Sequence, residues 1–137
     1  MTGNPERSAA SWQKAGAHCR EALAQDPEAS PIAVIHSSYY AMFNAARAVL
    51  FLVTGRAPKT HDRTIQQFGL LVRDLDDALR AAGRAFNEAR DERTAADYGE
   101  THAPSPEDAR DAVRATVAFL AACCARYGFP PVTPAAS

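Results

Sequence analysis

Polar side chains at helical spacing mark the segment "HSSYYAMFNAARAVLFL", residues 36–52, as a candidate site. On a helix these side chains form a stripe within an arc of about 80°, and the rest of the circumference is apolar. The stripe comprises His36, Tyr40, Asn44 and Arg47. A helix that is apolar all round is central to its bundle. Its polar groups then need partners, because a buried polar group without one costs about 1–3 kcal/mol.

A second segment, "RDERTAADY", offers such partners. Arg93 falls in line with the apolar positions Leu79 and Phe86, so its side chain should point into the bundle or into a cleft. Asp97 lies one turn further along, and a buried arginine needs a carboxylate or several acceptors. We expect the two segments to form one polar cluster. This cluster either fixes the register of the helices or lines a functional cleft.

The loop "GRAPKTHDR" is the most basic stretch of the chain and leads into a predicted helix. The free N–H groups at a helix N-terminus favour anions, which makes this loop a candidate phosphate site. The candidate residues are Lys59, Thr60, His61 and Arg63. The alternative is a solvated loop in which Thr60 or Asp62 caps the helix.

Neither the cysteines nor the aromatic residues of the central segment predict a cofactor site. Cys123 and Cys124 are adjacent, which suits neither an ordinary disulfide nor a zinc site, and Cys19 lies on another predicted helix. Core thiols are therefore expected, with no metal and no cofactor. Tyr39, Phe43 and the neighbouring Met42 and Phe51 are expected to pack in the core or a dimer interface rather than to stack on bases.

The elements that must position these residues all have helical periodicity. Ser30 and Pro31 begin the central helix, which Gly55 ends, and "SPED" at residues 105–108 begins the last helix with a capping box. The predicted helices cover about 7–24, 31–54, a short segment after the basic loop, 75–98, and 106–127. We expect an all-α, up-and-down antiparallel bundle of about five helices over residues 7–128. Residues 129–137, which are Pro-rich, are expected to be a disordered tail.

Length and charge limit the class of protein. A chain of 137 residues suits one domain with a sizeable core. The net charge of −1 excludes strong electrostatic binding of nucleic acid by the whole surface, so any such site must be local. Three cysteines and the polar N-terminus "MTGNPERSAA" predict a cytoplasmic protein with reduced thiols. No apolar run is long enough to span a bilayer.

The same segments carry a family resemblance over roughly Ser11 to Tyr127. "SSYYAMFNAARAVL", then "KTH", "RTAADYG" and "SPEDARDAVRATVAFL" together resemble the HEPN (higher eukaryotes and prokaryotes nucleotide-binding) domain, in its branch of small prokaryotic proteins. The resemblance implies a helical bundle that is commonly a homodimer. The family includes ribonuclease toxins, RNA-processing proteins and non-catalytic members. Many prokaryotic members are encoded beside a small nucleotidyltransferase that acts as antitoxin or partner.

The catalytic members of that family share an arginine followed, after four to six residues, by a histidine. Here Arg93 matches the arginine, but Tyr98 stands where the histidine would be, and His102 lies beyond Gly99 in a loop. A tyrosine with an ordinary pKa near 10 is a poor substitute for a histidine that titrates near neutral pH. Arg56 and His61 have the right spacing, but they lie in a loop, and we interpret that match as coincidental.

The leading hypothesis is a homodimeric HEPN-type module that binds nucleotide or RNA without cleaving it, or acts through a nucleotidyltransferase partner. Its ligand-binding residues would be Arg93, Asp97, Tyr98, His36, Tyr40, Asn44 and Arg47. The first alternative is a metal-independent ribonuclease toxin, in which Arg93 stabilises the transition state and His102 or His36 is the general acid or base. The second is a structural protein-interaction module without a ligand.

Overall fold

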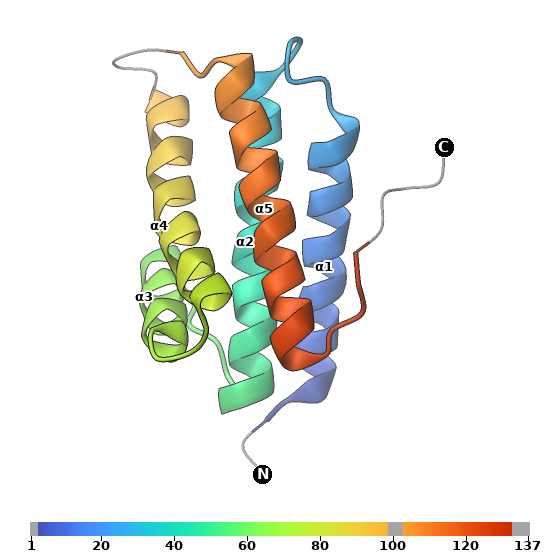
Figure 1. Cartoon of the computed structure of the whole chain (residues 1–137), viewed down its shortest axis with the longest axis vertical. Helices are drawn as coiled ribbons and strands as arrows, with labels where there is room; N and C mark the ends of the chain where they lie inside the picture. Colours follow the sequence, from blue (N-terminus) through green and yellow to red (C-terminus); the bar gives the residue numbers. More distant parts are fainter. Residues whose placement is uncertain (1–2, 99–102, 133–137) are drawn as a thin grey trace.

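Five helices make up the part of the chain that the structure describes, residues 3–98 and 103–132, with the side chains of residues 92 and 95–98 excepted. In this computed structural model they are α1 Pro5–Ala24, α2 Pro31–Thr54, α3 His61–Val72, α4 Asp77–Tyr98 and α5 Pro106–Tyr127. They pack antiparallel, with α2 and α5 between α1 on one side and α4 on the other, and the short α3 lies beside the lower part of α4 (Figure 1). The predicted all-α bundle is confirmed.

The helix ends follow from capping chemistry. Gly55 and Gly128 end α2 and α5 with positive φ angles of 85° and 76°, a conformation that favours glycine. The capping box at the start of α5 is present, with Ser105 and Asp108 each accepting a hydrogen bond from the backbone N–H of the other. Helix α4 begins at Asp77 rather than at Leu75, because the Asp76 carboxylate accepts a hydrogen bond from the N–H of Leu79.

Helix α2 is the centre of the bundle and packs against each of the other four helices. Ala41, Ala45 and Ala48 are fully buried, and such small side chains let neighbouring helices approach closely. One approach is marked by a hydrogen bond of 2.7 Å from the Ser8 hydroxyl to the backbone carbonyl of Ala48. The apolar surface of α2 is therefore covered by the other four helices of the same chain.

The segment after α5 lies against α1. The ring of Phe129 stacks on Trp12 with 4.4 Å between ring centroids, and the indole N–H of Trp12 donates a 2.9 Å hydrogen bond to the carbonyl of Pro130. The structure thus packs residues 129–132 against the bundle, where the sequence predicted the start of a disordered tail. A buried indole needs a hydrogen-bond acceptor, and this segment supplies it. Residues 133–137 of the predicted tail lie outside the described residues.

Candidate functional site

An aromatic cluster forms where α2 meets the first residue of α3. It consists of Tyr39, Tyr40, Phe43 and His61, and we call it the histidine cluster. The His61 ring stacks on Phe43 at 4.3 Å between centroids and 17° between planes, and it meets the edge of Tyr40 at 5.9 Å. These contacts hold the imidazole in one orientation at the surface of the bundle.

Local structure fixes His61 in this position. The Thr60 side chain caps α3 by accepting a hydrogen bond from the N–H of Arg63, which makes His61 the first helical residue. The guanidinium of Arg47 donates a 2.5 Å hydrogen bond to the carbonyl of Pro58 and lies over the ring of Phe43. Arg47 therefore holds the loop between α2 and α3 against α2.

His61 and Tyr39 share a hydrogen bond of 2.7 Å between Nδ1 and the hydroxyl oxygen. Burial raises the pKa of Tyr39 to about 12, so the hydroxyl keeps its proton near neutral pH. Burial also lowers the pKa of His61, and the positive charges of Arg93 and Arg90 lower it further, so the imidazole is neutral near pH 7. Either the hydroxyl donates to Nδ1, or a protonated Nδ1 donates to the hydroxyl oxygen.

Helix α4 brings two arginines to this cluster. The guanidinium carbon of Arg93 lies 5.4 Å from the ring centroid of Tyr39 and 5.5 Å from that of Tyr40. Arg90, one turn earlier, forms an ion pair of 2.5 Å with Asp62, the residue after His61, and so ties α4 to α3. A cation–π contact engages the face of a guanidinium, whereas the N–H groups that bind phosphate point outward in its plane. The arrangement therefore places a guanidinium beside a histidine, and this is a combination of groups whose chemistry suits an anion.

The four residues of the predicted polar stripe on α2 do not share one set of partners in the structure. Tyr40 contacts Arg93 through its ring, as the sequence predicted for this pair of segments. Asn44 donates its side-chain hydrogen bond to the carbonyl of Tyr40 on its own helix, and Arg47 faces the loop carbonyl instead. His36 lies half-buried one turn before Tyr40.

Three other predicted site residues cannot be placed. Asp97 and Tyr98 complete the backbone of α4, but their side chains lie outside the described residues, as does the whole of His102. Their roles stay predictions.

The basic loop lines a hollow of about 400 Å³ next to the start of α3. Arg56, Lys59 and Arg63 line it together, and none of the three forms an ion pair with a described residue. Thr60 also lines the hollow, with its side chain engaged as the helix cap. His61 belongs to the neighbouring histidine cluster rather than to this hollow, so the structure divides the predicted phosphate-binding set.

Tyr39 and Phe43 pack in or against the core, as the sequence predicted, and they also form part of the histidine cluster, which the sequence did not predict. Both positions follow the apolar pattern of α2, and Tyr39 is fully buried. The available signal was the pair of adjacent tyrosines followed by "KTH" at a helix start, which places a histidine within reach of the central helix.

Comparison with known families supports this architecture. The sequence model of the HEPN domain matches residues 11–127, which is most of the chain. The chain belongs to the HEPN domain family. No curated protein and no solved structure matches the chain. The histidine cluster therefore lies in a HEPN bundle, next to the α4 arginine that the family resemblance singles out.

Other classes of site find no support among the described residues of this HEPN chain. No group of His, Cys, Asp and Glu side chains within residues 3–98 and 103–132 could hold a metal ion. The three thiols are unpaired, and burial raises the pKa of Cys19, Cys123 and Cys124. Over the same ranges, no helix is long and apolar enough to cross a bilayer.

Proposed function

We propose that this HEPN chain is a module that binds nucleotide or RNA at the histidine cluster without cleaving it, and that works with a small nucleotidyltransferase partner in a toxin–antitoxin-like pair. The observation that carries the binding half is the position of Arg93, whose guanidinium lies over the rings of Tyr39 and Tyr40 beside His61. A planar guanidinium is the group best matched to a phosphate.

Base stacking adds to this phosphate contact. Tyr40, Phe43 and His61 are half-buried, so part of each ring is accessible, and every nucleobase has a π-face that stacks on such rings. The cations Arg56 and Lys59 lie in the loop that leads to His61, and they would provide charge for the next phosphate. Because His61 is neutral near pH 7, binding should not depend on its protonation.

The non-catalytic half of the proposal rests on the number of proton-transfer groups. Cleavage of RNA needs a group that takes the proton from the 2′-hydroxyl and one that protonates the leaving oxygen. Among the described residues, His61 is the histidine placed beside Arg93, whereas His18 reaches the cluster only through Tyr40, at 5.8 Å between ring centroids. The sequence places Tyr98 where catalytic relatives carry their histidine.

Fluorescence anisotropy with a fluorescein-labelled single-stranded RNA of mixed sequence, at low salt, tests the binding. Arg93→Ala should weaken binding by about tenfold, the loss of one charge-assisted phosphate contact. Lys59→Ala combined with Arg63→Ala should weaken it less and reduce its salt dependence. Lys14→Ala on the exposed face of α1 is the control and should have no effect. Equal affinity for the Arg93→Ala and Lys14→Ala variants would contradict the proposal.

A metal-independent ribonuclease is the second candidate, and the proximity of His61 to Arg93 favours it. With Nδ1–H donating to Tyr39, Nε2 of His61 would accept the 2′-hydroxyl proton while the 2′-oxygen attacks phosphorus. The bond from phosphorus to the 5′-oxygen would break, a water molecule would protonate that oxygen, and a 2′,3′-cyclic phosphate would remain. Arg93 would stabilise the charge that develops on the phosphoryl oxygens. Incubation with total RNA in EDTA decides. We expect no cleavage; cleavage that is lost in His61→Ala and kept in His102→Ala would establish this candidate instead.

The partner half of the proposal rests on family membership. Co-expression with a nucleotidyltransferase encoded by the neighbouring gene should give a complex that stays together in size-exclusion chromatography. A neighbouring gene of another class, or separate elution of the two proteins, would leave the binding half standing alone.

A further inference from the structure

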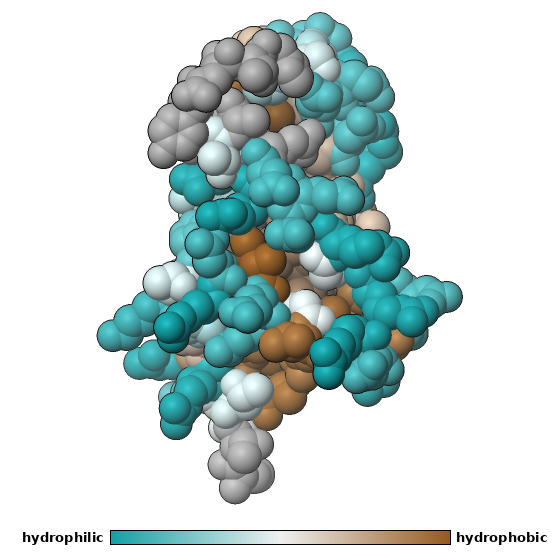
Figure 2. Space-filling model, turned by 90° about the vertical axis from the view of Figure 1, so that its left-hand side faces the viewer, coloured by the Kyte–Doolittle hydropathy of each residue, from teal (hydrophilic) through white to brown (hydrophobic). Residues whose placement is uncertain are grey.

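A groove of about 540 Å³ runs between α3 and α4. It adjoins the histidine cluster at the Asp62–Arg90 ion pair, but none of the four rings of that cluster is among its lining residues. Figure 2 faces this side of the molecule and shows hydrophobic side chains exposed along its centre between hydrophilic flanks. Ile65 and Leu70 of α3 line the groove, and Leu70 leaves 54% of its surface exposed, the largest fraction among the exposed large hydrophobic residues described. An apolar surface of this kind marks an interaction site.

Two glycines hollow out the groove. A Cβ atom on Gly83 would come within 3.2 Å of Val72 and 3.8 Å of the Gly69 backbone, so the glycines let α3 and α4 approach closely. A Cβ atom on Gly69 would meet nothing within 4 Å. The groove is therefore open above Gly69, and a side chain added there would begin in open space and extend into the groove.

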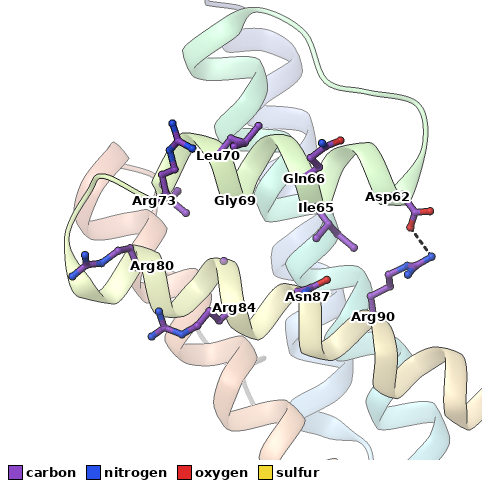
Figure 3. A pocket seen from close by; sticks show the side chains of 12 residues that line it. Asp62, Ile65, Gln66, Gly69, Leu70, Arg73, Arg80, Arg84, Asn87 and Arg90 are labelled. Atoms are coloured by element: carbon purple, nitrogen blue, oxygen red, sulfur yellow. Dashed lines mark ion pairs between the residues drawn. The ribbon is translucent and has the colours of Figure 1, made fainter.

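Charged groups stand around this apolar floor. Arg73, Arg80 and Arg84 gather near one end, and the Asp62–Arg90 ion pair closes the other (Figure 3). Arg73 pairs with Asp74 and Arg80 pairs with Asp77. Arg84 forms no ion pair with a described residue. The groove thus combines an apolar floor with an available cation at its edge.

We infer that this groove docks an amphipathic helix of a partner protein that carries acidic residues beside its apolar ridge. From Asp62 to Arg73 the α3 wall is about 17 Å long, which matches three turns of a docked helix. Apolar side chains at helical spacing would cover Ile65, Leu70 and the hollow over Gly69. A carboxylate beside them would pair with Arg84, and longer acidic segments would also reach Arg73 and Arg80.

The same observations disfavour two other occupants. A symmetric contact with a second copy would place the same arginine-rimmed groove on both sides, so that like charges face each other. An RNA strand needs aromatic side chains for stacking, and no described aromatic residue lines this groove. Three of the four arginines that line it already have carboxylate partners. Both occupants are outcomes of the test below.

The test uses two matched synthetic helices of about 14 residues, roughly 20 Å long. They share a leucine ridge and differ only in their flanking residues, which are glutamates in one and lysines in the other. Binding of each labelled peptide to the full chain is measured by anisotropy, with the wild type and three variants. Gly69→Leu fills the groove, Arg84→Glu reverses the charge at its edge, and Lys14→Glu is a matched change on the exposed face of α1.

We expect the acidic helix to bind the wild type about tenfold more tightly than the basic one. Gly69→Leu should abolish this binding, Arg84→Glu should remove the preference for the acidic peptide, and Lys14→Glu should change neither. Circular dichroism confirms that each variant is folded. Equal binding of the two peptides, or undiminished binding to Gly69→Leu, would overturn the inference.

Two further readouts identify the alternative occupants. A Gly69→Leu variant that loses RNA binding would assign the groove to RNA and overturn protein docking. A wild-type dimer that Gly69→Leu converts to a monomer would assign it to a second copy, with the same consequence. Because neither substitution touches Arg93 or His61, loss of peptide binding with RNA binding intact separates this inference from the proposed function.

Discussion

The hydroxyl of Tyr39 in α2 lies 2.7 Å from Nδ1 of His61, the first residue of α3, and the hydrogen bond between them joins the two helices on either side of the basic loop. Tyr39 is fully buried in the central helix, whereas His61 begins the short helix at the edge of the bundle. A buried hydroxyl needs a partner, and a histidine at the surface needs a fixed orientation before it can take part in recognition. The hydrogen bond between them gives the buried hydroxyl its partner and holds the His61 ring in place. His61 therefore contributes to the packing of the bundle as well as to the candidate site.

The lowered pKa of His61 predicts that stability depends on pH. The unfolded chain has a histidine with an ordinary pKa of about 6.5, and the folded chain binds the proton less readily. The unfolded state therefore binds more protons as the pH falls below about 6.5, and the stability contribution present above that pH is lost. Thermal melts between about pH 7.5 and pH 5.5 should show a smaller decrease in Tm for His61→Gln than for the wild type. Equal decreases would mean that other groups account for the dependence.

The contact between Trp12 and Phe129 predicts a role for the last described segment in stability. Phe129→Ala removes a stacked ring and should cost about 1–2 kcal/mol. Trp12 is the only tryptophan, so its fluorescence should shift to longer wavelength as its ring becomes exposed. Pro131→Ala, at an exposed position of the same segment, is the control. An unchanged emission maximum for Phe129→Ala would show that the segment does not protect the indole in solution.

Local sequence signals predicted the parts of the fold that local chemistry determines. Ser30, Pro31 and Gly55 placed both ends of α2 correctly, and the "SPED" motif placed the start of α5. Ser30 occupies the N-cap position without a side-chain capping hydrogen bond, so Pro31 at the first helical position is the signal that the structure supports there. The glycine end and the capping box depend on residues within one turn of each other, so the sequence contains the whole interaction. The start of α4 was predicted two residues early because an apolar pattern locates a helix face but not its cap.

Contacts between distant residues could not be predicted in the same way. The sequence identified Arg93 and Tyr40 as members of one cluster, since both interrupt apolar stripes on helices expected to face each other. It did not bring His61 to them, because the position of α3 depends on a loop that Arg47 holds through the carbonyl of Pro58. The hydrogen bond from Trp12 to Pro130 spans most of the chain and has no local signal.

A homodimer remains a prediction, and the structure suggests which face would form it. The groove of about 590 Å³ between α1 and α5 contains Leu23 and Val117, which are 43% and 44% exposed, and no charged side chain of the described residues lines it. An uncharged apolar surface can face its own copy without repulsion, unlike the arginine-rimmed groove between α3 and α4. Light scattering at micromolar concentration should give about twice the chain mass, and Leu23→Asp with Val117→Asp should give a monomer. A wild type that is already monomeric would refute the prediction.

The last prediction separates a structural role of Arg93 from a ligand-binding one. Arg93 is half-buried, and its guanidinium rests on two tyrosine rings, so Arg93→Ala should cost about 1–2 kcal/mol of stability through lost cation–π contacts and lost packing. The sequence pairs Arg93 with Asp97, and breaking a buried pair of this kind would cost about 3–5 kcal/mol instead.

Denaturant melts of three variants distinguish these cases. If the buried pair dominates, Arg93→Met with Asp97→Asn should recover much of the loss seen in Arg93→Ala, because no unpaired charge remains. If the rings dominate, the double variant should stay close to Arg93→Ala. Arg93→Lys keeps the charge but not the planar group, so it should retain most of the stability and lose most of the RNA affinity. Full RNA affinity in Arg93→Lys, or a midpoint for Arg93→Ala equal to that of the wild type, would contradict the assignment of Arg93 as a phosphate-binding arginine held on Tyr39 and Tyr40.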